Sequence, residues 1–228
     1  EEAQAAAEAK AEALKAAAAQ HVAEAEAVKK AKAAEEASKA AEEVFGKKES
    51  RVEERLIEKI ESLCQRLSKE LTDIKAVGCI KGPGNYTGLR LSITVAKTIA
   101  HVQNIPVYGY DTFDLLTESV QGVNTVVWGI IPGRRGEWNC RLMNTQKKKK
   151  AMTPHFSIKK DQCQSQLEKI EEEVVLVGPS LEEINVSHTK IETSIEARRI
   201  AKKASEEYQK KKESQYQTLV PFYSHDPI

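Results

Sequence analysis

A glycine-rich run at residues 82–90, GPGNYTGLR, has the strongest potential for chemistry in this sequence. Such a turn can hold a phosphate group where it leads into a helix, because its backbone amides and the helix N-terminus both attract anions. Asn85 or Thr87 can cap the first amides of that helix. The run has neither the lysine of a P-loop nor the glycine spacing of a Rossmann fingerprint, so we interpret it as a structural turn. The candidate turn residues are Gly82, Pro83, Gly84, Thr87 and Gly88.

Histidines and cysteines are scattered along the sequence without the spacing of a metal site or a catalytic pair. The five histidines are His21, His101, His155, His188 and His225, and the four cysteines are Cys64, Cys79, Cys140 and Cys163. No two cysteines form the close pair that structural zinc uses, and no serine–histidine or cysteine–histidine pairing can be read. We therefore expect no catalytic residue, no bound metal, no cofactor, and thiols that stay reduced.

The charge balance is close to neutral, with 35 Lys and Arg against 34 Asp and Glu in 228 residues. A strong field for nucleic acid is therefore not indicated, and we interpret the run Lys147–Lys150 as a solvated loop rather than a phosphate contact. No apolar run approaches the roughly 20 residues of a membrane span, and the N-terminus has no hydrophobic signal core. We expect a cytoplasmic protein without membrane contact.

The first 43 residues differ in composition from the rest of the chain. Alanine occupies 20 of these positions, and Gly, Pro and aromatic residues are absent. This composition favours a helix, but only Leu14, Val22 and Val28 are large and apolar, which is too few for the seam of a coiled coil. We interpret residues 1–46 as a solvated Ala-rich helical extension or a replaced segment.

An amphipathic helix is predicted at residues 51–67, where apolar side chains recur every three or four positions. The members of this stripe are Val52, Leu56, Ile60, Leu63 and Leu67, and Ile57 and Cys64 widen it. Ser50 together with Glu53 fits a capping box at the start of the helix. Stripes of this kind are most often core faces, so we expect it to be buried.

A second helix, predicted at residues 86–103, is apolar on two opposite sides. One side carries Leu89, Ile93, Ala96 and Ala100. The other side carries Leu91, Val95, Ile99 and Val102. Such a helix must be covered twice. One side can lie on a sheet, while the other needs the helix at 51–67, or forms with that helix a patch for another protein. The sequence does not decide which side faces the sheet.

Short strands alternate with helices after residue 73. Strands are predicted at 76–80, 106–110, 124–131, 137–145 and 173–177. Further helices are predicted at 112–120, with Asp111 or Thr112 as the cap, at 161–170 and at 193–211. The turn at Gly133–Gly136 joins two of the strands as a hairpin. This order of elements predicts an α/β fold.

The run from Asp73 to Val107 resembles the signature of the TsaB family, which is also called YeaZ-like or glycoprotease-like. The shared features are the GPG turn, the aromatic Tyr86, the TGLR that follows it, the Ala96–Lys97 pair and a later Ile-Pro. The segment IIPGRRGEWNCRL and the end PFYSHDPI resemble further family segments, so the likeness covers most of residues 51–228. The family provides the non-catalytic partner subunit of the bacterial pathway that makes threonylcarbamoyl-adenosine on tRNA.

This resemblance implies an actin-like ATPase (ribonuclease H-like) fold and a scaffold role. The chain would dimerise with a catalytic TsaD-type subunit, which modifies adenosine 37 of tRNA. A TsaE-type ATPase would also join, and tRNA would be contacted indirectly through the complex. A homodimer is the assembly implied for the chain alone. The implied contact residues lie on the helices at 51–67 and 86–103, and they are Leu56, Ile60, Leu63, Tyr86, Leu89, Arg90, Ile93, Val95 and Lys97.

The sequence departs from the TsaB family at its front. The family begins with three strands, and residues 1–43 contain nothing that could form them. We therefore expect an incomplete first sheet with an added Ala-rich helix, and a bare strand edge at residues 76–80. The predicted divisions are the extension at 1–46, a remnant of the N-terminal actin-like subdomain at 47–122, and the C-terminal subdomain at 123–228.

Two alternative functions remain open at this point. One is an ATP-dependent carbamoyl-type transferase of the same fold, and the other is a plain helical interaction module. TsaD-type catalysts carry a metal-binding histidine pair on the helix that matches 51–67, and this chain has no histidine there. The family aspartate before Ala-Arg is likewise replaced by Pro132-Gly133. The resemblance therefore implies a chain without catalytic residues.

Overall fold

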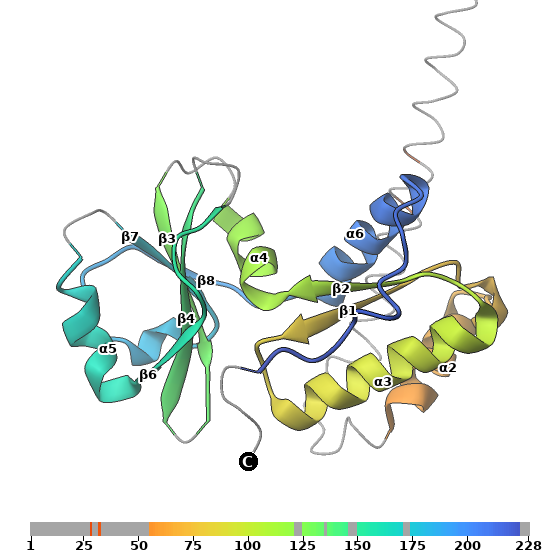
Figure 1. The fold of residues 1–228 in the computed structure, drawn as a ribbon, viewed down its shortest axis with the longest axis horizontal. Helices are drawn as coiled ribbons and strands as arrows, with labels where there is room; N and C mark the ends of the chain where they lie inside the picture. The colour runs from red at the N-terminus through yellow and green to blue at the C-terminus, as the bar shows by residue number, and fades with distance from the viewer. Residues whose placement is uncertain are drawn as a thin grey trace, which may run out of the picture. The chain divides into compact units, whose positions relative to one another are not determined.

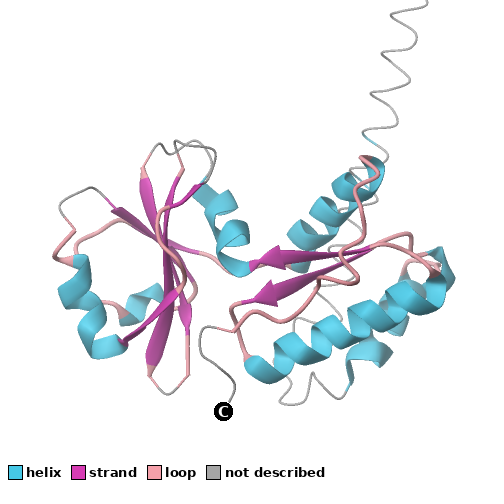
Figure 2. Ribbon diagram, viewed as in Figure 1, coloured by secondary structure: helices cyan, strands magenta, loops and turns pink. Residues whose placement is uncertain are grey.

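The computed structural model describes residues 28, 32, 55–120, 125–134, 136–145, 150–170 and 174–223 (Figure 1). The chain divides into two compact units, Glu1–Leu71 and Thr72–Ile228, and each is described by itself. Figure 2 shows strands and helices mixed along the second unit, which confirms the predicted α/β class. None of the described helices has the length and apolar character that crossing a membrane requires.

Helix α2 (Leu56–Arg66) is the main described element of the first unit. It ends where the Leu67 N–H bonds to the carbonyls of Leu63 and Cys64, and Ser68 then takes a left-handed φ of 53°. The predicted start of this helix and its capping box lie outside the described residues. Val28 and Lys32 are helical, and the rest of the predicted Ala-rich extension also lies outside the described residues.

The apolar stripe of α2 is not buried. Four members of the stripe are partly exposed, namely Leu56, Ile60, Leu63 and Leu67. Ile57 is 56% exposed, and the buried residue of the helix is Lys59. The expectation that this stripe is a core face is therefore wrong for the described part of α2. An apolar stripe that remains partly in water is surface that another chain can cover.

The first sheet of the second unit is built from two described strands, β1 (Val77–Gly82) and β2 (Val107–Asp111). They run parallel, with Val77 opposite Val107 and Ile80 opposite Tyr110. Helix α3 (Tyr86–Gln103) makes the crossover between them, at the bounds expected from the sequence. Parallel strands need such a crossover because their ends lie at opposite edges of the sheet. Two strands among the described residues agree with the expected incomplete sheet.

Both faces of the first sheet are covered. On one face, Cys79 and Val107 pack with residues of α3 and with Leu219. On the other face, Tyr108 and Tyr110 pack with residues of α6 (Ala197–Gln209). The chain therefore returns to this sheet after passing through the second one. The predicted boundary between residues 122 and 123 stays a prediction, but α6 and the residues after it pack on the first sheet.

The second sheet has the strand order β5-β4-β3-β7-β8, with β6 also paired to β4. Its strands are β3 (Val126–Pro132), β4 (Glu137–Asn144), β5 (Lys150–Ala151), β6 (Phe156–Lys159), β7 (Val174–Gly178) and β8 (Lys190–Glu192). The predicted hairpin is confirmed, because β3 and β4 are antiparallel neighbours. Strand β7 runs parallel to β3, and β8 runs parallel to β7.

Each face of the second sheet carries its own apolar cluster. One cluster joins Trp128, Trp138 and Leu176 to Leu167 of α5 (Lys160–Leu167). The other joins Val127, Met143 and Val177 of the sheet to Phe113 and Leu116 of α4 (Thr112–Thr117). Successive side chains of one strand therefore point to opposite faces of the sheet and pack into different apolar clusters. Three short 3₁₀ helices, Leu71–Asp73, Glu118–Val120 and Leu181–Glu183, complete the described elements.

The prediction for the last helix was too long at its start. The helix was expected from Thr193, but it begins at Ala197, and the preceding residues 190–192 form β8. The Thr193 N–H continues the pairing with the Gly178 carbonyl at 3.0 Å, which holds the backbone extended. Strands β5 and β6 were not predicted. Most of the basic run at 147–150 lies outside the described residues, and Lys150 begins β5.

Candidate functional site

The glycine-rich turn connects the end of β1 to the start of α3. Gly82 has a φ of +124°, and a Cβ atom there would lie 2.2 Å from the carbonyl oxygen of Phe222, so glycine is required. Asn85 is the N-cap, because its side chain accepts the Gly88 N–H at 2.9 Å. The Thr112 hydroxyl donates to the Pro83 carbonyl at 2.6 Å. The turn is therefore fixed by its own cap and by the first residue of α4.

A cavity of about 380 Å³ lies beside this turn. Its lining is Ile80, Pro83, Gly84, Asn85, Gly88, Leu89, Ser92, Thr112, Ile131, Pro132 and Ile195. None of these lining residues is charged, and the Ser92 and Thr112 hydroxyls donate to backbone carbonyls. A polyphosphate needs cations or free amides to offset its charge. The cavity therefore suits an apolar group better than a nucleotide.

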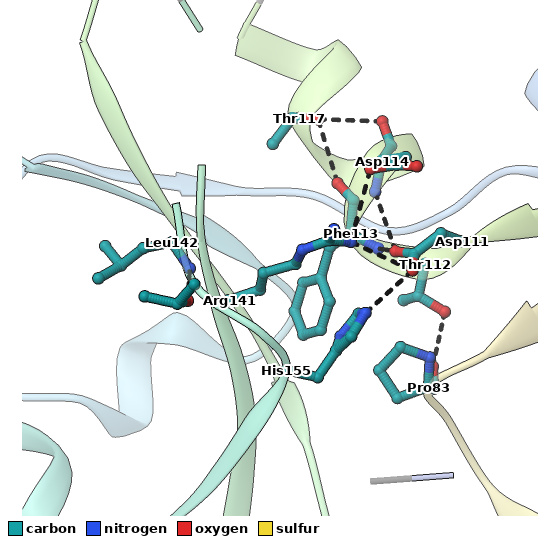
Figure 3. A network of polar contacts seen from close by, with 10 residues as sticks. Pro83, Asp111, Thr112, Phe113, Asp114, Thr117, Arg141, Leu142 and His155 are labelled. Carbon is teal, nitrogen blue, oxygen red and sulfur yellow. Dashed lines mark hydrogen bonds and ion pairs between the residues drawn. The ribbon is translucent and has the colours of Figure 1, made fainter. Parts of the chain in front are cut away.

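A polar network centred on Asp111 joins the end of β2 to the second sheet (Figure 3). One carboxylate oxygen caps α4 by accepting the Phe113 and Asp114 N–H groups at 2.8 and 3.3 Å. The other oxygen lies 3.2 Å from Nη1 of Arg141 and 3.1 Å from Nε2 of His155. The carboxylate thus has partners on every side and acts as a clamp between elements.

Electrostatics keep this clamp ionised. Burial raises the pKa of the Asp111 carboxyl. The hydrogen bond from His155 and the electrostatic effects of His155 and Arg141 lower it by more than burial raises it, so that the pKa lies below its ordinary value. Burial and the neighbouring Asp111 charge raise the pKa of Asp114. A carboxylate with a lowered pKa and full hydrogen bonding is a poor general base. The network therefore has the character of a structural joint.

The buried cysteines Cys79, Cys140 and Cys163 are poor candidates for nucleophilic chemistry. Burial raises the pKa of the Cys79 thiol to about 11 and that of Cys140 to about 12. Burial also raises the pKa of Cys163. The reactive form of cysteine is the thiolate, which these environments disfavour. Within the part of the chain that the structure describes, no group of three or more His, Cys, Asp and Glu residues could hold a metal ion.

The two apolar sides of α3 lie in different environments. The side that faces the sheet consists of Leu89, Ile93, Ala96 and Ala100, all at most 6% exposed. On the opposite side Leu91, Val95 and Ile99 are partly exposed, and Val102 is 76% exposed. Leu89 and Ile93 are therefore core residues and cannot be partner contacts, which corrects their assignment. The outer side of α3 is the side available to a partner.

The polar candidates on α3 contact residues within the same unit. Arg90 donates to the Tyr86 hydroxyl at 2.7 Å and lies over the Tyr86 ring at 5.1 Å. Lys97 donates to the Leu219 carbonyl at 3.4 Å and lies over the Tyr216 ring at 4.9 Å. Lys97 therefore anchors the C-terminal residues, while the exposed Arg90 keeps free donors.

Two features of the site were not predicted from the sequence. The Asp111 network was missed because Arg141 and His155 are distant in the chain, and Asp111 was considered only as a helix cap. The return of residues 212–223 to the first sheet was also missed, because that segment has no periodic pattern. The GPG run was interpreted as a turn because of its two glycines. In the structure Gly82 has a positive φ, which glycine readily adopts.

A family model matches more than half of the chain. The model is that of TsaD, tRNA N6-adenosine threonylcarbamoyltransferase, and it covers residues 47–185. Two curated relatives are each named tRNA threonylcarbamoyladenosine biosynthesis protein TsaB. The protein of Bacillus subtilis (strain 168) is 32% identical over 65 residues, which is 28% of either chain. The protein of Escherichia coli (strain K12) is 29% identical over 86 residues, or 37% of either chain. The chain thus matches well under half of the length of these relatives.

Two solved structures from Pseudomonas aeruginosa share the fold. One is YeaZ, with a TM-score of 0.57 and 16% identity, over 75% of this chain and 83% of that one. The other is an uncharacterized protein with similarity to peptidase YEAZ, with a TM-score of 0.58, the same identity and the same coverage. At this identity the likeness concerns the fold. Together with the family match it confirms the actin-like ATPase fold expected from the sequence.

Proposed function

Because the chain belongs to the TsaD family and its curated relatives are TsaB proteins, we propose that it is a non-catalytic partner subunit in tRNA threonylcarbamoylation. Its partner is a catalytic TsaD-type subunit, which modifies adenosine 37 of tRNA. A TsaE-type ATPase joins the complex, and tRNA is reached through the complex rather than by this chain alone.

The observation that carries this proposal is the outer side of α3. Leu91, Val95 and Ile99 are partly exposed there, although the same helix buries its other side at 6% exposure or less. Water contact with such a stripe costs about 25 cal/mol per Å² of apolar surface. The partly exposed stripe of α2 offers a second apolar helix surface. The proposed docking surface of the second unit is the outer side of α3. Leu56, Ile60 and Leu63 of α2 are proposed separately as partner contacts of the first unit.

The polar groups of the second unit support a non-catalytic role. The cavity beside the GPG turn has no charged lining residue, and the described thiols with raised pKa are poor nucleophiles. The Asp111 carboxylate is engaged by Arg141, by His155 and by two backbone amides. These groups stabilise the unit and leave the transfer chemistry to the partner.

Reconstitution tests the proposal against the alternative of an ATP-dependent transferase. The chain is purified alone and together with TsaD-type and TsaE-type subunits of the same source, and threonylcarbamoyl incorporation into tRNA and ATP turnover are measured. We expect the chain alone to do neither, and incorporation to require both the chain and the catalytic subunit. Incorporation by the chain alone, with ATP turnover, would establish the transferase instead.

A further inference from the structure

The C-terminal residues form a strap along α3, which we define as residues 214–223. The Tyr216 ring stacks on His101 at 5.9 Å, near the end of the helix. The Tyr223 ring packs on Tyr86 at 4.8 Å, at the start of the helix. Between these points the Leu219 carbonyl accepts from Lys97. The strap therefore runs antiparallel to α3 over most of its length.

The strap is anchored at some side chains and exposed at others. Leu219 is 2% exposed and belongs to the apolar cluster between α3 and the first sheet. The Gln215 N–H donates to the Val107 carbonyl at 2.9 Å, and the Phe222 N–H donates to the Lys81 carbonyl at 2.6 Å. Val220 is nevertheless 62% exposed and Phe222 38% exposed. Because the backbone of the strap is already fixed at these points, little conformational entropy is lost when a partner covers the two exposed side chains.

Charge on this side of the unit has one sign. Helix α3 contains Arg90, Lys97 and His101 and no acidic residue, and the strap contains no charged residue at all. Lys97 is occupied by the strap, which leaves Arg90 as the exposed cation with free donors. The Tyr86 hydroxyl and ring hold the Arg90 side chain in place. A held guanidinium next to aromatic and apolar groups is the composition of a binding hot spot.

We propose that Arg90, Tyr86, Val220, Phe222 and Tyr223 form a second part of the docking surface, and that it receives a carboxylate of the catalytic subunit flanked by apolar side chains. This inference rests on the proposed function. The surface is continuous with the outer side of α3, because the exposed residues Thr87, Thr94 and Thr98 lie between them on the helix. Arg90 pairs with the carboxylate, and the apolar side chains of the strap exclude water around that pair.

Two other occupants fit less well. A second copy of this chain docked through the same surface would bring two Arg90 side chains together without an acidic residue from α3 or the strap between them, which costs binding energy. RNA bases stack on open aromatic faces, but the Tyr86 ring is already engaged by Arg90 at 5.1 Å and by Tyr223 at 4.8 Å. An acidic protein surface is the complement that remains.

Calorimetric titration with the purified TsaD-type catalytic subunit tests the strap surface. Arg90→Met and Val220→Asp should each weaken binding by about tenfold, as expected for hot-spot residues. Matched controls are Lys202→Met and Tyr208→Asp on α6, which covers the other face of the first sheet. The controls should bind within about twofold of wild type, because surface changes away from an interface have small effects. Thermal unfolding confirms that every variant is folded.

The outcomes separate this inference from the proposed function. If wild type binds and Val95→Asp does not, while both strap variants bind like wild type, the strap surface is overturned and the partner role stands. If wild type does not bind the catalytic subunit, the partner role fails and the strap surface fails with it. Filter binding of tRNA to the same variants tests whether Arg90 contacts RNA instead of the catalytic subunit. A loss that occurs with tRNA alone assigns Arg90 to RNA and also overturns the inference.

Discussion

The two sheets of the second unit are closed to different degrees. Strand β7 is buried over its whole length, and β3 is buried from Val126 to Ile131. In the first sheet, β2 is buried from Val107 to Tyr110, but β1 buries only Cys79 and Gly82 and leaves its other residues partly exposed. Its helix α3 buries one apolar side and leaves the other partly in water.

This difference separates stability from association. Apolar surface that is buried inside the unit stabilises the fold, whereas apolar surface that remains exposed can contribute only when another chain covers it. The second sheet therefore provides most of the described core, and the first sheet with α3 provides the proposed contact surface. Substitutions in the two regions should differ in kind: one set lowers the free energy of unfolding, and the other lowers affinity.

The largest effect is expected on the buried side of α3. Ile93→Asp places a charge where the side chain is 4% exposed and has apolar neighbours, and the second unit should lose about 4 kcal/mol or more of stability. Circular dichroism during urea titration measures this loss. Ile93→Val, a change of one methyl group, is the control and should cost about 1 kcal/mol. A folded Ile93→Asp protein with an unchanged midpoint would contradict the assignment of the two sides.

A truncation in the closed sheet should have a smaller but clear effect. Leu176 is fully buried on β7, so Leu176→Ala should destabilise by about 3 kcal/mol through lost contacts and a cavity. Val102→Ala on the outer side of α3 is the matched change at 76% exposure, and it should stay within about 0.5 kcal/mol. Equal effects of the two truncations in chemical denaturation would remove the contrast between the regions.

The contribution of the Asp111 network to the free energy of unfolding should depend on pH. Asp111→Asn keeps the cap of α4 but removes the charge that Arg141 and His155 contact, at a cost of about 2 kcal/mol near neutral pH. The folded pKa of Asp111 is lowered, so its contribution is present above the unfolded pKa of about 3.9 and is lost as pH falls through the folded value.

Urea midpoints between pH 7 and pH 2 measure this linkage. The difference between wild type and Asp111→Asn should shrink below about pH 4. Asp161→Asn at the exposed first turn of α5 is the control, and its difference from wild type should stay within about 0.5 kcal/mol throughout. A gap at Asp111 that is independent of pH would mean that the charge does not act in the joint.

Local patterns were sufficient to predict much of this fold from the sequence. The bounds of α3, the Asp111 cap and the β3–β4 hairpin follow from periodicity and turn residues that lie close together in the chain. The strap and β8 could not be predicted in this way. Their backbones are fixed by hydrogen bonds to distant residues, for example from Gln215 to Val107. Short segments of this kind have no periodic pattern in the sequence that would predict their structure.

The candidate site was predicted less completely than the fold. The sequence showed that α3 is apolar on two sides, but the choice between them depends on which side the first sheet covers. The resemblance to the TsaB family placed Leu89 and Ile93 among the partner contacts, although both are core residues. Lys97 was assigned there as well, because nothing near it in the sequence indicates that the Leu219 carbonyl lies beside it.

The central claim is that the outer side of α3 binds the catalytic subunit. The most direct test is calorimetric titration of the purified TsaD-type subunit into wild type and into Val95→Asp, a change at a partly exposed position. We predict that Val95→Asp keeps the wild-type unfolding midpoint but loses affinity by about 100-fold or more, because it places an unpaired charge in an apolar contact. A folded Val95→Asp protein that binds with wild-type affinity would contradict the claim.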